Sequence, residues 1–482
     1  MKQRTRLTGT IIRPDDPGYG QARRNWNPFT NAMPRVFVFA ATNEDVSNAV
    51  KWARENNVPI RIRSGRHALA KDFSQTDCGI VIDTCQMRGV KVNTTKGTAT
   101  VQPGIRVGAL VRMLASKGFL APFGDSSTVG IGGISTGGGI TAIQRTVGLI
   151  SDNILSATIV DANGEILHVS EEENPDLLWA IRVGGGGNFG IITSYTFAIH
   201  PAPTQVGIFQ ITWPWEQIDE VIDAWQRWAP SVDVRLGTIL EALSKTNGLL
   251  RSQGIFLGHA AELKKLILPL MNTGRPSSFF IDEVSLPEAI DFWAPEEPFF
   301  DTQNTTWSSA WVEKCLPSEG IKAIRSFLER ATGSESNFFF LNSGGAMNRV
   351  DPKDTAFFWR NTKYYIEWDA SWTDKSETRE SHELVERTRL RLQPYVTGSY
   401  VNVPDLSIDD YGHEYWGGNF ARLRKIKAKY DPENVFHFVQ SIPPAPKRDC
   451  DYGDLREEPN TAEESYITEE KYIIDDVDFD LS

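Results

Sequence analysis

Two glycine-dense segments constrain the fold of this chain more than any other feature. The first, GDSSTVGIGGISTGGGI, covers residues 124–140, and the second, GGGGNFG, covers residues 184–190. Glycine at this density suits neither a helix interior nor a central strand, because it loses much conformational freedom on folding and packs no side chain. Apolar residues such as Val129 and Ile134 recur too regularly for a flexible surface loop. We therefore expect backbone that adopts positive φ angles or closely approaches a bound molecule.

The second segment also contains the pattern G-x-G-x-x-G, from Gly185 to Gly190. This dinucleotide fingerprint requires a strand before the glycines and a helix after them. Here the helical pattern NPDLLWAIR comes before, the β-branched run IITSYTFAI follows, and no acidic residue lies near position 210 to hold a ribose. A nicotinamide-binding Rossmann domain is therefore disfavoured.

Residues 34–62 predict a strand, a helix and a second strand. RVFVFA is rich in β-forming residues, Thr42 can cap the next helix with Asp45 at its third position, and NNVP ends that helix. The second strand leads into RSGRH, which contains His67, one of only seven histidines. Loops at strand ends commonly display binding groups, so this histidine is a candidate functional residue.

Further along the chain, the residue patterns predict a second domain inserted into the first. Residues 79–102 indicate three short strands, and VGALVRMLASKG indicates an amphipathic helix closed by Gly118. From residue 206 to about 400, apolar strands such as SNFFFLNSG mix with helices such as GIKAIRSFLERAT, which is typical of an α/β domain. After it, a basic helix is stopped by Asp431 and Pro432.

The charge of the chain argues against nucleic acid as a partner. The net charge is −12 over 482 residues, but residues 451–482 hold twelve Asp and Glu against two basic residues, so the rest is close to neutral. Phosphate binding needs a basic face, and none is visible. No apolar run is long enough for a signal peptide or a membrane helix, so we expect a soluble, cytoplasmic protein. Four cysteines fit neither a zinc site nor a disulfide framework, and Cys78 and Cys85 are expected to be free thiols.

Four motifs occur in the order and spacing of a known family. They are RSGRH, the stretch TVGIGGISTGGGI with GLISDNILSA after it, DLLWAIRVGGGGNFGIITS, and YWGGNFARLRKIKAKYDPENVFHFVQSIPP. From residue 34 to 445 the chain resembles the berberine-bridge-enzyme-like flavin oxidoreductases of the vanillyl-alcohol-oxidase superfamily. The resemblance implies an α+β fold, in which a two-part PCMH-type FAD-binding domain (1–205 and 401–446) carries an inserted α/β substrate domain with an antiparallel sheet (206–400). The acidic tail, 447–482, has no counterpart in the family.

The resemblance also implies FAD as the cofactor, attached covalently through His67. In the family, a histidine at this position is bonded to the 8α-methyl carbon of the isoalloxazine ring, and the RSG amides and arginine charge would face the pyrophosphate. No metal ion is expected. The other residues that the motifs place around FAD are Arg63, Ser64, Gly65, Arg66, Ala68, Ser126, Val129, Gly130, Gly132, Gly133, Gly138, Asp152, Asn153, Gly187, Asn188, Gly190, Ile192, Trp416 and Asn419.

Two positions, Ser126 and Arg66, depart from the family pattern, and a third, Val129, bears on the choice of electron acceptor. Many relatives form a second flavin bond from a cysteine in the context CPTVG, whereas this chain has SSTVG, so Ser126 stands there and a single bond through His67 is expected. Arg66 stands where relatives commonly have glycine. Val129 aligns with the position that guards the oxygen-reactive face of the flavin, and its small size favours O2 as electron acceptor.

Two residues of the strand predicted for KYYIEWDASW are candidates for catalysis. Period-two alternation places Tyr365, Glu367 and Asp369 on one face of that strand. Burial raises the pKa of a carboxyl group and makes it a stronger base, so Glu367 is the leading candidate and Tyr365 the second. A solvated acid on the strand face is the alternative for Glu367.

The expected substrate pocket is more apolar than in sugar-oxidising relatives. Leu69, Ile140 and Val403 stand at positions where relatives have aromatic or polar residues. Sugars need several hydrogen-bond partners, and unpaired ones are costly. The substrate is therefore expected to be a small organic molecule such as a hydrophobic alcohol, an amine or a phenolic metabolite.

Together, these features predict an FAD-dependent oxidase that passes hydride from a small organic substrate to flavin N5, with reoxidation by molecular oxygen. The alternative is a low-turnover flavin-binding structural protein such as a spore-coat component, because some bacterial relatives are associated with spore coats. No membrane partner is expected, and the sequence leaves oligomer formation open.

Overall fold

The computed structural model describes residues 4–28, 32–70, 72–122, 124, 126–295 and 303–446. Met1–Ala445 belong to one structural unit and Pro446–Ser482 to another. The acidic tail identified in the sequence lies outside the described residues, as does Cys450.

A four-stranded sheet with the order β1-β2-β4-β3 lies in the N-terminal part. Its strands are β1 (Thr10–Ile12), β2 (Val36–Phe39), β3 (Ile60–Arg63) and β4 (Ile80–Asp83), of which the last three run parallel. Helix α2 (Asn43–Glu55) packs against them through its apolar face. The Thr42 hydroxyl accepts from the Asp45 amide and the Asp45 carboxylate accepts from the Thr42 amide, which confirms the predicted cap and strand–helix–strand unit.

The second sheet is antiparallel and has the order β5-β6-β10-β8-β9. Its strands are β5 (Val90–Asn93), β6 (Thr98–Val101), β8 (Ile154–Val160), β9 (Ile166–Val169) and β10 (Ile191–Ala198). Helices α3 (Val107–Ala115) and α6 (Pro175–Ile181) add buried apolar side chains to the same core. Because α6 precedes the second glycine segment and β10 follows it, the order is the reverse of a Rossmann unit, as predicted.

The first glycine segment contains a short helix, α4 (Ile131–Thr136), which the sequence analysis did not expect. The expectation that glycine density excludes a helix interior is therefore wrong here. The reason is close packing, since a Cβ atom on Gly132 would lie 2.8 Å from the Ser64 hydroxyl. Glycine keeps this helix near the loop that follows β3.

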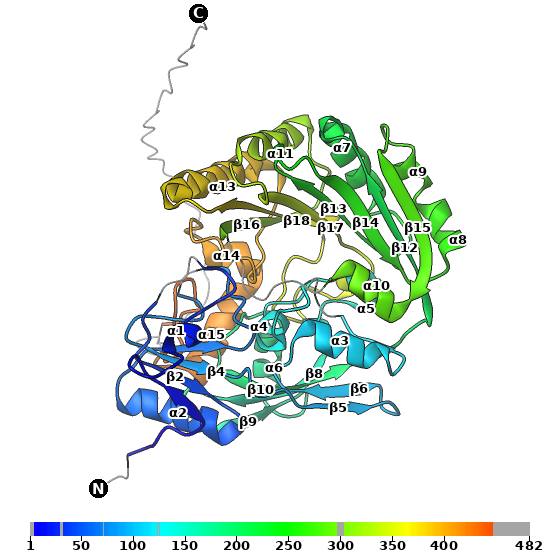
Figure 1. Cartoon of the computed structure of the whole chain (residues 1–482). Coiled ribbons are helices and arrows are strands. Elements are labelled where there is room, and N and C mark those ends of the chain that lie inside the picture. Colours follow the sequence, from blue (N-terminus) through cyan, green and yellow to red (C-terminus); the bar gives the residue numbers. More distant parts are fainter. Residues whose placement is uncertain are drawn as a thin grey trace, which may run out of the picture. The chain divides into compact units, whose positions relative to one another are not determined.

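A seven-stranded antiparallel sheet, with the order β15-β12-β14-β13-β17-β18-β16, forms the middle of the chain. Its strands are β12 (Gln205–Thr212), β13 (Leu236–Leu243), β14 (Leu250–Phe256), β15 (Ser278–Ser285), β16 (Asn304–Val312), β17 (Asn337–Asn342) and β18 (Tyr364–Trp372). Helices α7 (Ile218–Trp228), α11 (Ser318–Arg330) and α13 (Thr378–Leu392) cover one face, and the other face turns toward the two smaller sheets (Figure 1). The predicted α+β class with an antiparallel sheet is confirmed. The domain boundaries at residues 205 and 400 stay predictions.

Shorter elements lie between the strands of these sheets. They are α1 (Tyr19–Ala22), α5 (Gln144–Val147), α8 (Ala260–Leu266), α9 (Leu268–Met271), α10 (Leu286–Trp293), α12 (Ala346–Arg349), and the strand pair β7 (Phe119–Leu120) and β11 (His200–Pro201). Within the described part of the chain, no helix is long and apolar enough to cross a membrane. Cys78, Cys85 and Cys315 are free thiols, as predicted for the first two.

The C-terminal helices α14 (Tyr411–Trp416) and α15 (Phe420–Tyr430) return the chain to the second glycine segment. The buried Lys427 ammonium donates to the carbonyls of Asn188 and Phe436 and to the Asp431 carboxylate, at 2.6, 2.6 and 2.7 Å. The Ile442 amide donates to Asn188 Oδ1 at 2.8 Å. The two bonds to Asn188 join segments more than 230 residues apart in sequence and fix two walls of the cavity described next.

Candidate active site

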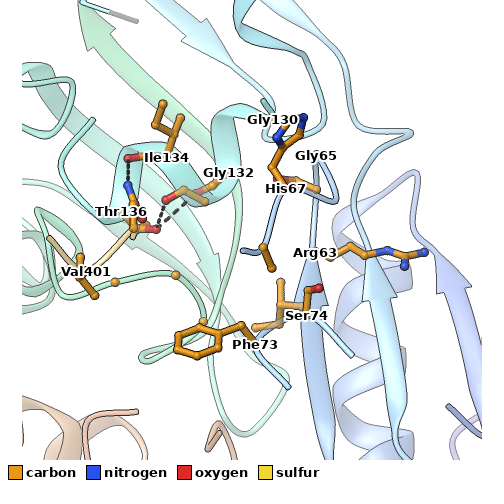
Figure 2. A pocket seen from close by; sticks show the side chains of 18 of the residues that line it. Arg63, Gly65, His67, Phe73, Ser74, Gly130, Gly132, Ile134, Thr136 and Val401 are labelled. Carbon is orange, nitrogen blue, oxygen red and sulfur yellow. Dashed lines mark hydrogen bonds between the residues drawn. The ribbon is translucent and has the colours of Figure 1, made fainter. Parts of the chain in front are cut away.

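A cavity of about 540 Å³ collects residues from every motif singled out in the sequence. The loop after β3, both glycine segments and the C-terminal segment from Phe436 to Gln440 form one end. The open face of the seven-stranded sheet contributes Trp307, Phe339 and Glu367 to the other end. Figure 2 shows His67 beside Gly65 and Gly130, with Thr136 and Val401 across the cavity.

The His67 ring is held on its face and on its edge. The Trp26 indole stacks on it with ring centroids 5.4 Å apart and an interplanar angle of 21°. Thr128 Oγ1 lies 2.9 Å from His67 Nε2. Burial, followed by the nearby Arg106 charge, lowers the pKa of His67 from 6.5 to about 3. The imidazole is therefore neutral at pH 7, which leaves one ring nitrogen with a lone pair for bonding.

Gly65 and Gly130 bring two loops into direct backbone contact. A Cβ atom on Gly65 would lie 2.1 Å from the Gly130 nitrogen, and one on Gly130 would lie 2.5 Å from the Gly65 nitrogen. No side chain fits at either position without moving one loop. This crossing places His67 next to Thr128, and it explains why glycine is required in both motifs.

The side chains of both arginines of RSGRH lie beside the carboxylate of Asp83. Arg63 Nε donates to Asp83 Oδ2 at 2.7 Å, with the two side chains 1% and 0% exposed, and Figure 2 shows the Arg63 side chain pointing away from His67. Arg66 Nε lies 3.4 Å from the same oxygen, and Arg66 has a φ of +62°. The arginine charge expected at the pyrophosphate is therefore partly neutralised by Asp83, and the loop offers mainly its backbone to the cavity.

Most of the predicted cofactor-binding residues line the cavity. They are Arg63, Ser64, Gly65, Arg66, His67, Ala68, Ser126, Val129, Gly130, Gly132, Gly133, Gly187, Asn188, Gly190, Ile192 and Trp416.

Four predicted cofactor-binding residues do not line it and instead brace neighbouring loops. Asp152 forms a two-pronged ion pair with Arg360, at 2.6 and 2.8 Å. The Asn153 amide donates to the carbonyls of Val147 and Leu149, and the Asn419 amide donates to those of Pro352, Thr355 and Ala356. Gly138, with a φ of +120°, packs against the Tyr400 ring. A motif alone does not distinguish residues that contact a ligand from residues that support its site.

Glu367 and Tyr365 lie on one face of β18, as their spacing predicts. The Tyr365 hydroxyl donates to Glu367 Oε2 at 2.7 Å. Glu367 lines the cavity, opposite Phe339 of β17 and Ser309 of β16. Tyr365 is fully buried behind it and does not line the cavity; burial and the Glu367 charge raise its pKa well above 10. Tyr365 therefore stays protonated, and its link to the cavity is the hydrogen bond that it donates to the Glu367 carboxylate.

Several cavity residues were missed by sequence reasoning. The Tyr400 hydroxyl accepts from the Gly139 amide at 2.8 Å and from Asn402 Nδ2 at 3.0 Å, and burial raises its pKa to about 12. Both residues belong to the segment YVN, which the family resemblance links to the active site, but neither was assigned a role from the sequence. Trp26 and Trp307 have no comparable local signal, because tertiary packing alone brings them to the cavity.

One part of the cavity is largely apolar. Leu69, Ile140 and Val403 all line it, together with Trp307 and Phe339. The polar side chains beside them are Glu367, Tyr400 and Asn402. Such a surface suits a small molecule with a hydrophobic body and few hydrogen-bonding groups.

Comparisons with known proteins agree with this geometry. The profile of the FAD binding domain matches residues 34–170, and that of berberine and berberine-like proteins matches residues 399–443. The FAD-linked oxidoreductase YvdP of Bacillus subtilis is 55% identical over 92% of this chain and 99% of its own length. The chain belongs to the berberine bridge enzyme-like family of FAD-linked oxidoreductases.

Two further relatives support this berberine bridge enzyme-like assignment. A monolignol oxidoreductase of Arabidopsis thaliana is 31% identical over 86% of this chain and 84% of its own length. The solved structure of BBE-like 1 from Physcomitrella patens superposes with a TM-score of 0.84 at 28% identity, covering 90% of this chain and 96% of that one. The cavity residues fit FAD, because glycine backbone and a neutral, buried imidazole line the cavity, and a Cβ on Gly133 would enter open space there. The family assignment also rules out the nicotinamide interpretation of the second glycine segment.

Proposed function

We propose that this protein is an FAD-dependent oxidase whose flavin is held by one covalent bond to His67. The observation that carries the proposal is the neutral, ring-stacked His67 in a cavity built by all four family motifs. Ser126 lines the same cavity at the position where many relatives have a second anchoring cysteine. A serine hydroxyl is a much weaker nucleophile than a thiolate, which supports a single bond.

When bound, FAD supplies the acceptor for the hydride that leaves the substrate carbon. In our proposal, Glu367 removes the proton from the substrate heteroatom. The Tyr365 hydroxyl, donating to Glu367 Oε2, fixes the orientation of that carboxylate. The aromatic and aliphatic walls exclude water, which keeps the base effective.

The substrate that fits this end of the cavity is a small molecule with an oxidisable alcohol or amine on a hydrophobic, aromatic body. Trp307 and Phe339 offer flat apolar surfaces, and Leu69, Ile140 and Val403 offer no hydrogen bonds. A sugar would leave most of its hydroxyls unpaired here. The name of the monolignol oxidoreductase relative is consistent with phenolic alcohols as the first compounds to test.

We further propose that O2 reoxidises the flavin, because Val129 is a small residue on the cavity wall. The cytoplasm is the proposed location. No feature of the described residues or of the relatives favours the structural spore-coat alternative.

The test is anaerobic reduction by a panel of aromatic alcohols and amines. The yellow absorbance of the holoenzyme should bleach with a member of the panel and return when air is admitted. A sugar panel serves as the comparison. Flavin that no alcohol or amine bleaches would contradict the proposed substrate class, and reduced flavin that is stable in air would contradict the oxidase assignment.

A further inference from the structure

Thr128 reaches the cavity through two lining residues, His67 and Ser126, and its shorter contact is to the histidine ring. Its hydroxyl oxygen lies 2.9 Å from His67 Nε2 and 3.3 Å from the Ser126 hydroxyl. The Thr128 side chain is buried, and the residue does not line the cavity. A role for this hydroxyl must therefore be sought in what it does to His67.

The ring of His67 has little freedom to turn. Trp26 stacks on its face, and the Trp26 amide donates to the Arg66 carbonyl at 2.9 Å, so the indole is tied to the same loop. Thr128 contacts the ring edge from the other glycine-containing loop. The Gly65–Gly130 crossing fixes the distance between these loops. Together these contacts determine where each ring nitrogen lies.

We propose that Thr128 is the positioning residue for covalent flavin attachment: it accepts the hydrogen bond from Nε2–H of His67 and thereby keeps the lone pair of the neutral ring on Nδ1. A neutral imidazole carries one N–H, and the nitrogen that forms a new bond must be the other one. This inference rests on the proposed covalent bond through His67 and adds which residue makes that nitrogen reactive.

The attachment step balances with O2 as the final oxidant. Joining Nδ1 to the 8α-methyl carbon forms one C–N bond and breaks one methyl C–H bond and one imidazole N–H bond. The two protons and two electrons that are released reduce the isoalloxazine ring, and O2 then accepts them to give hydrogen peroxide. The Nε2 proton is one of the two that are released; Thr128 Oγ1 accepts its hydrogen bond and so holds it on Nε2 until the C–N bond has formed, but does not itself take up the proton.

The experiment compares flavin binding with flavin attachment in single variants. Protein made in flavin-deficient cells is mixed with FAD, and samples are taken at intervals. Absorbance of the native sample measures bound flavin. The sample is then denatured and run on a gel, and fluorescence of the protein band measures covalently attached flavin. Thr128→Val should bind FAD as the wild type does and attach it at least tenfold more slowly. Thr128→Ser should attach it at nearly the wild-type rate. Ser127→Ala is the matched control, because the Ser127 hydroxyl donates to the Pro295 carbonyl and not to His67.

Two results would overturn the inference. The first is flavin attachment by Thr128→Val at the wild-type rate. The second is loss of FAD binding in that variant, because this would show that Thr128 has only a structural role. If the valine variant does not fold, Thr128→Ala and Thr128→Ser, which differ by one oxygen atom, decide the question. Equal rates in this pair would also overturn it. A wild-type protein that never attaches flavin would instead contradict the proposed function.

Discussion

The two ends of the cavity are built in different ways. The end proposed to hold the flavin is built largely from backbone around His67, with glycines at a loop crossing that has no space for a Cβ atom. The substrate end consists of side chains on the face of an antiparallel sheet, drawn from β16, β17 and β18. A backbone-built site tolerates almost no substitution, whereas side chains on a sheet can change while the sheet remains. The comparison predicts that substitutions at the first end abolish flavin binding, whereas substitutions at the second end change the reaction of the substrate and leave flavin binding intact.

The strongest test of this contrast is Gly65→Ala. The added methyl group would lie 2.1 Å from the Gly130 nitrogen, so the loops must separate and His67 must move from Thr128. We expect loss of about 1–3 kcal/mol of stability and near-complete loss of bound flavin. Gly20→Ala is the control, since Gly20 does not line the cavity and a Cβ there meets nothing within 4 Å. Thermal melting and flavin absorbance measure both effects, and normal flavin content in Gly65→Ala would contradict the account of the crossing.

At the substrate end, Glu367→Gln should separate chemistry from cofactor binding. Removing the base is expected to slow anaerobic flavin reduction by about 10²- to 10⁴-fold, while the flavin spectrum and flavin content stay unchanged. Stopped-flow absorbance at saturating substrate measures the rate. An unchanged rate would remove Glu367 from the base role.

A smaller effect is expected for Tyr365→Phe, which deletes only the hydroxyl that donates to Glu367 Oε2. Without this donor the Glu367 carboxylate is no longer held in one orientation, so reduction should slow by up to about 100-fold. Loss of this donor also raises the pKa of the carboxyl group, so the pH profile of reduction should shift upward. A slower rate with an unmoved pH profile would point to packing rather than to the hydrogen bond.

Val129→Leu should affect only the reaction with oxygen. The larger side chain is expected to slow reoxidation of reduced flavin by about tenfold, which corresponds to about 1.4 kcal/mol of barrier, and to leave anaerobic reduction unchanged. Mixing the reduced enzyme with aerated buffer measures this step. Equal slowing of both half-reactions would show that Val129 acts on flavin placement.

A further effect concerns pH and the flavin-free protein. The pKa of His67 is lowered from 6.5 to about 3, so between these values the unfolded chain binds a proton that the folded protein does not. The free energy of unfolding therefore decreases as the pH falls from 6.5 toward 3. His67→Gln lacks this contribution, and its melting temperature should fall less over the same range. Parallel melting curves for the two proteins would contradict a buried neutral histidine.

The same contrast explains how much the sequence could predict. Glycine positions, the Thr42 cap and the alternation of Tyr365 and Glu367 are local consequences of backbone geometry, and each was predicted. The short helix α4 was missed because close packing against Ser64, rather than helix propensity, places glycine there.

The cavity walls were harder to predict, because they join distant segments. The stacking of Trp26 on His67 and the contribution of Trp307 depend on tertiary packing, which no local pattern encodes. Asp152 and Asn419 were assigned to the cofactor from their motifs, yet they bond to Arg360 and to backbone carbonyls beside the cavity.

The central claim, that one flavin is bonded to His67, is tested most directly by intact mass spectrometry of the denatured protein. The wild type should show the mass of the chain plus one FAD, and His67→Ala should show the mass of the chain alone while binding flavin reversibly in its native state. Wild-type protein at the unmodified mass, or His67→Ala that retains the added mass, would contradict the account.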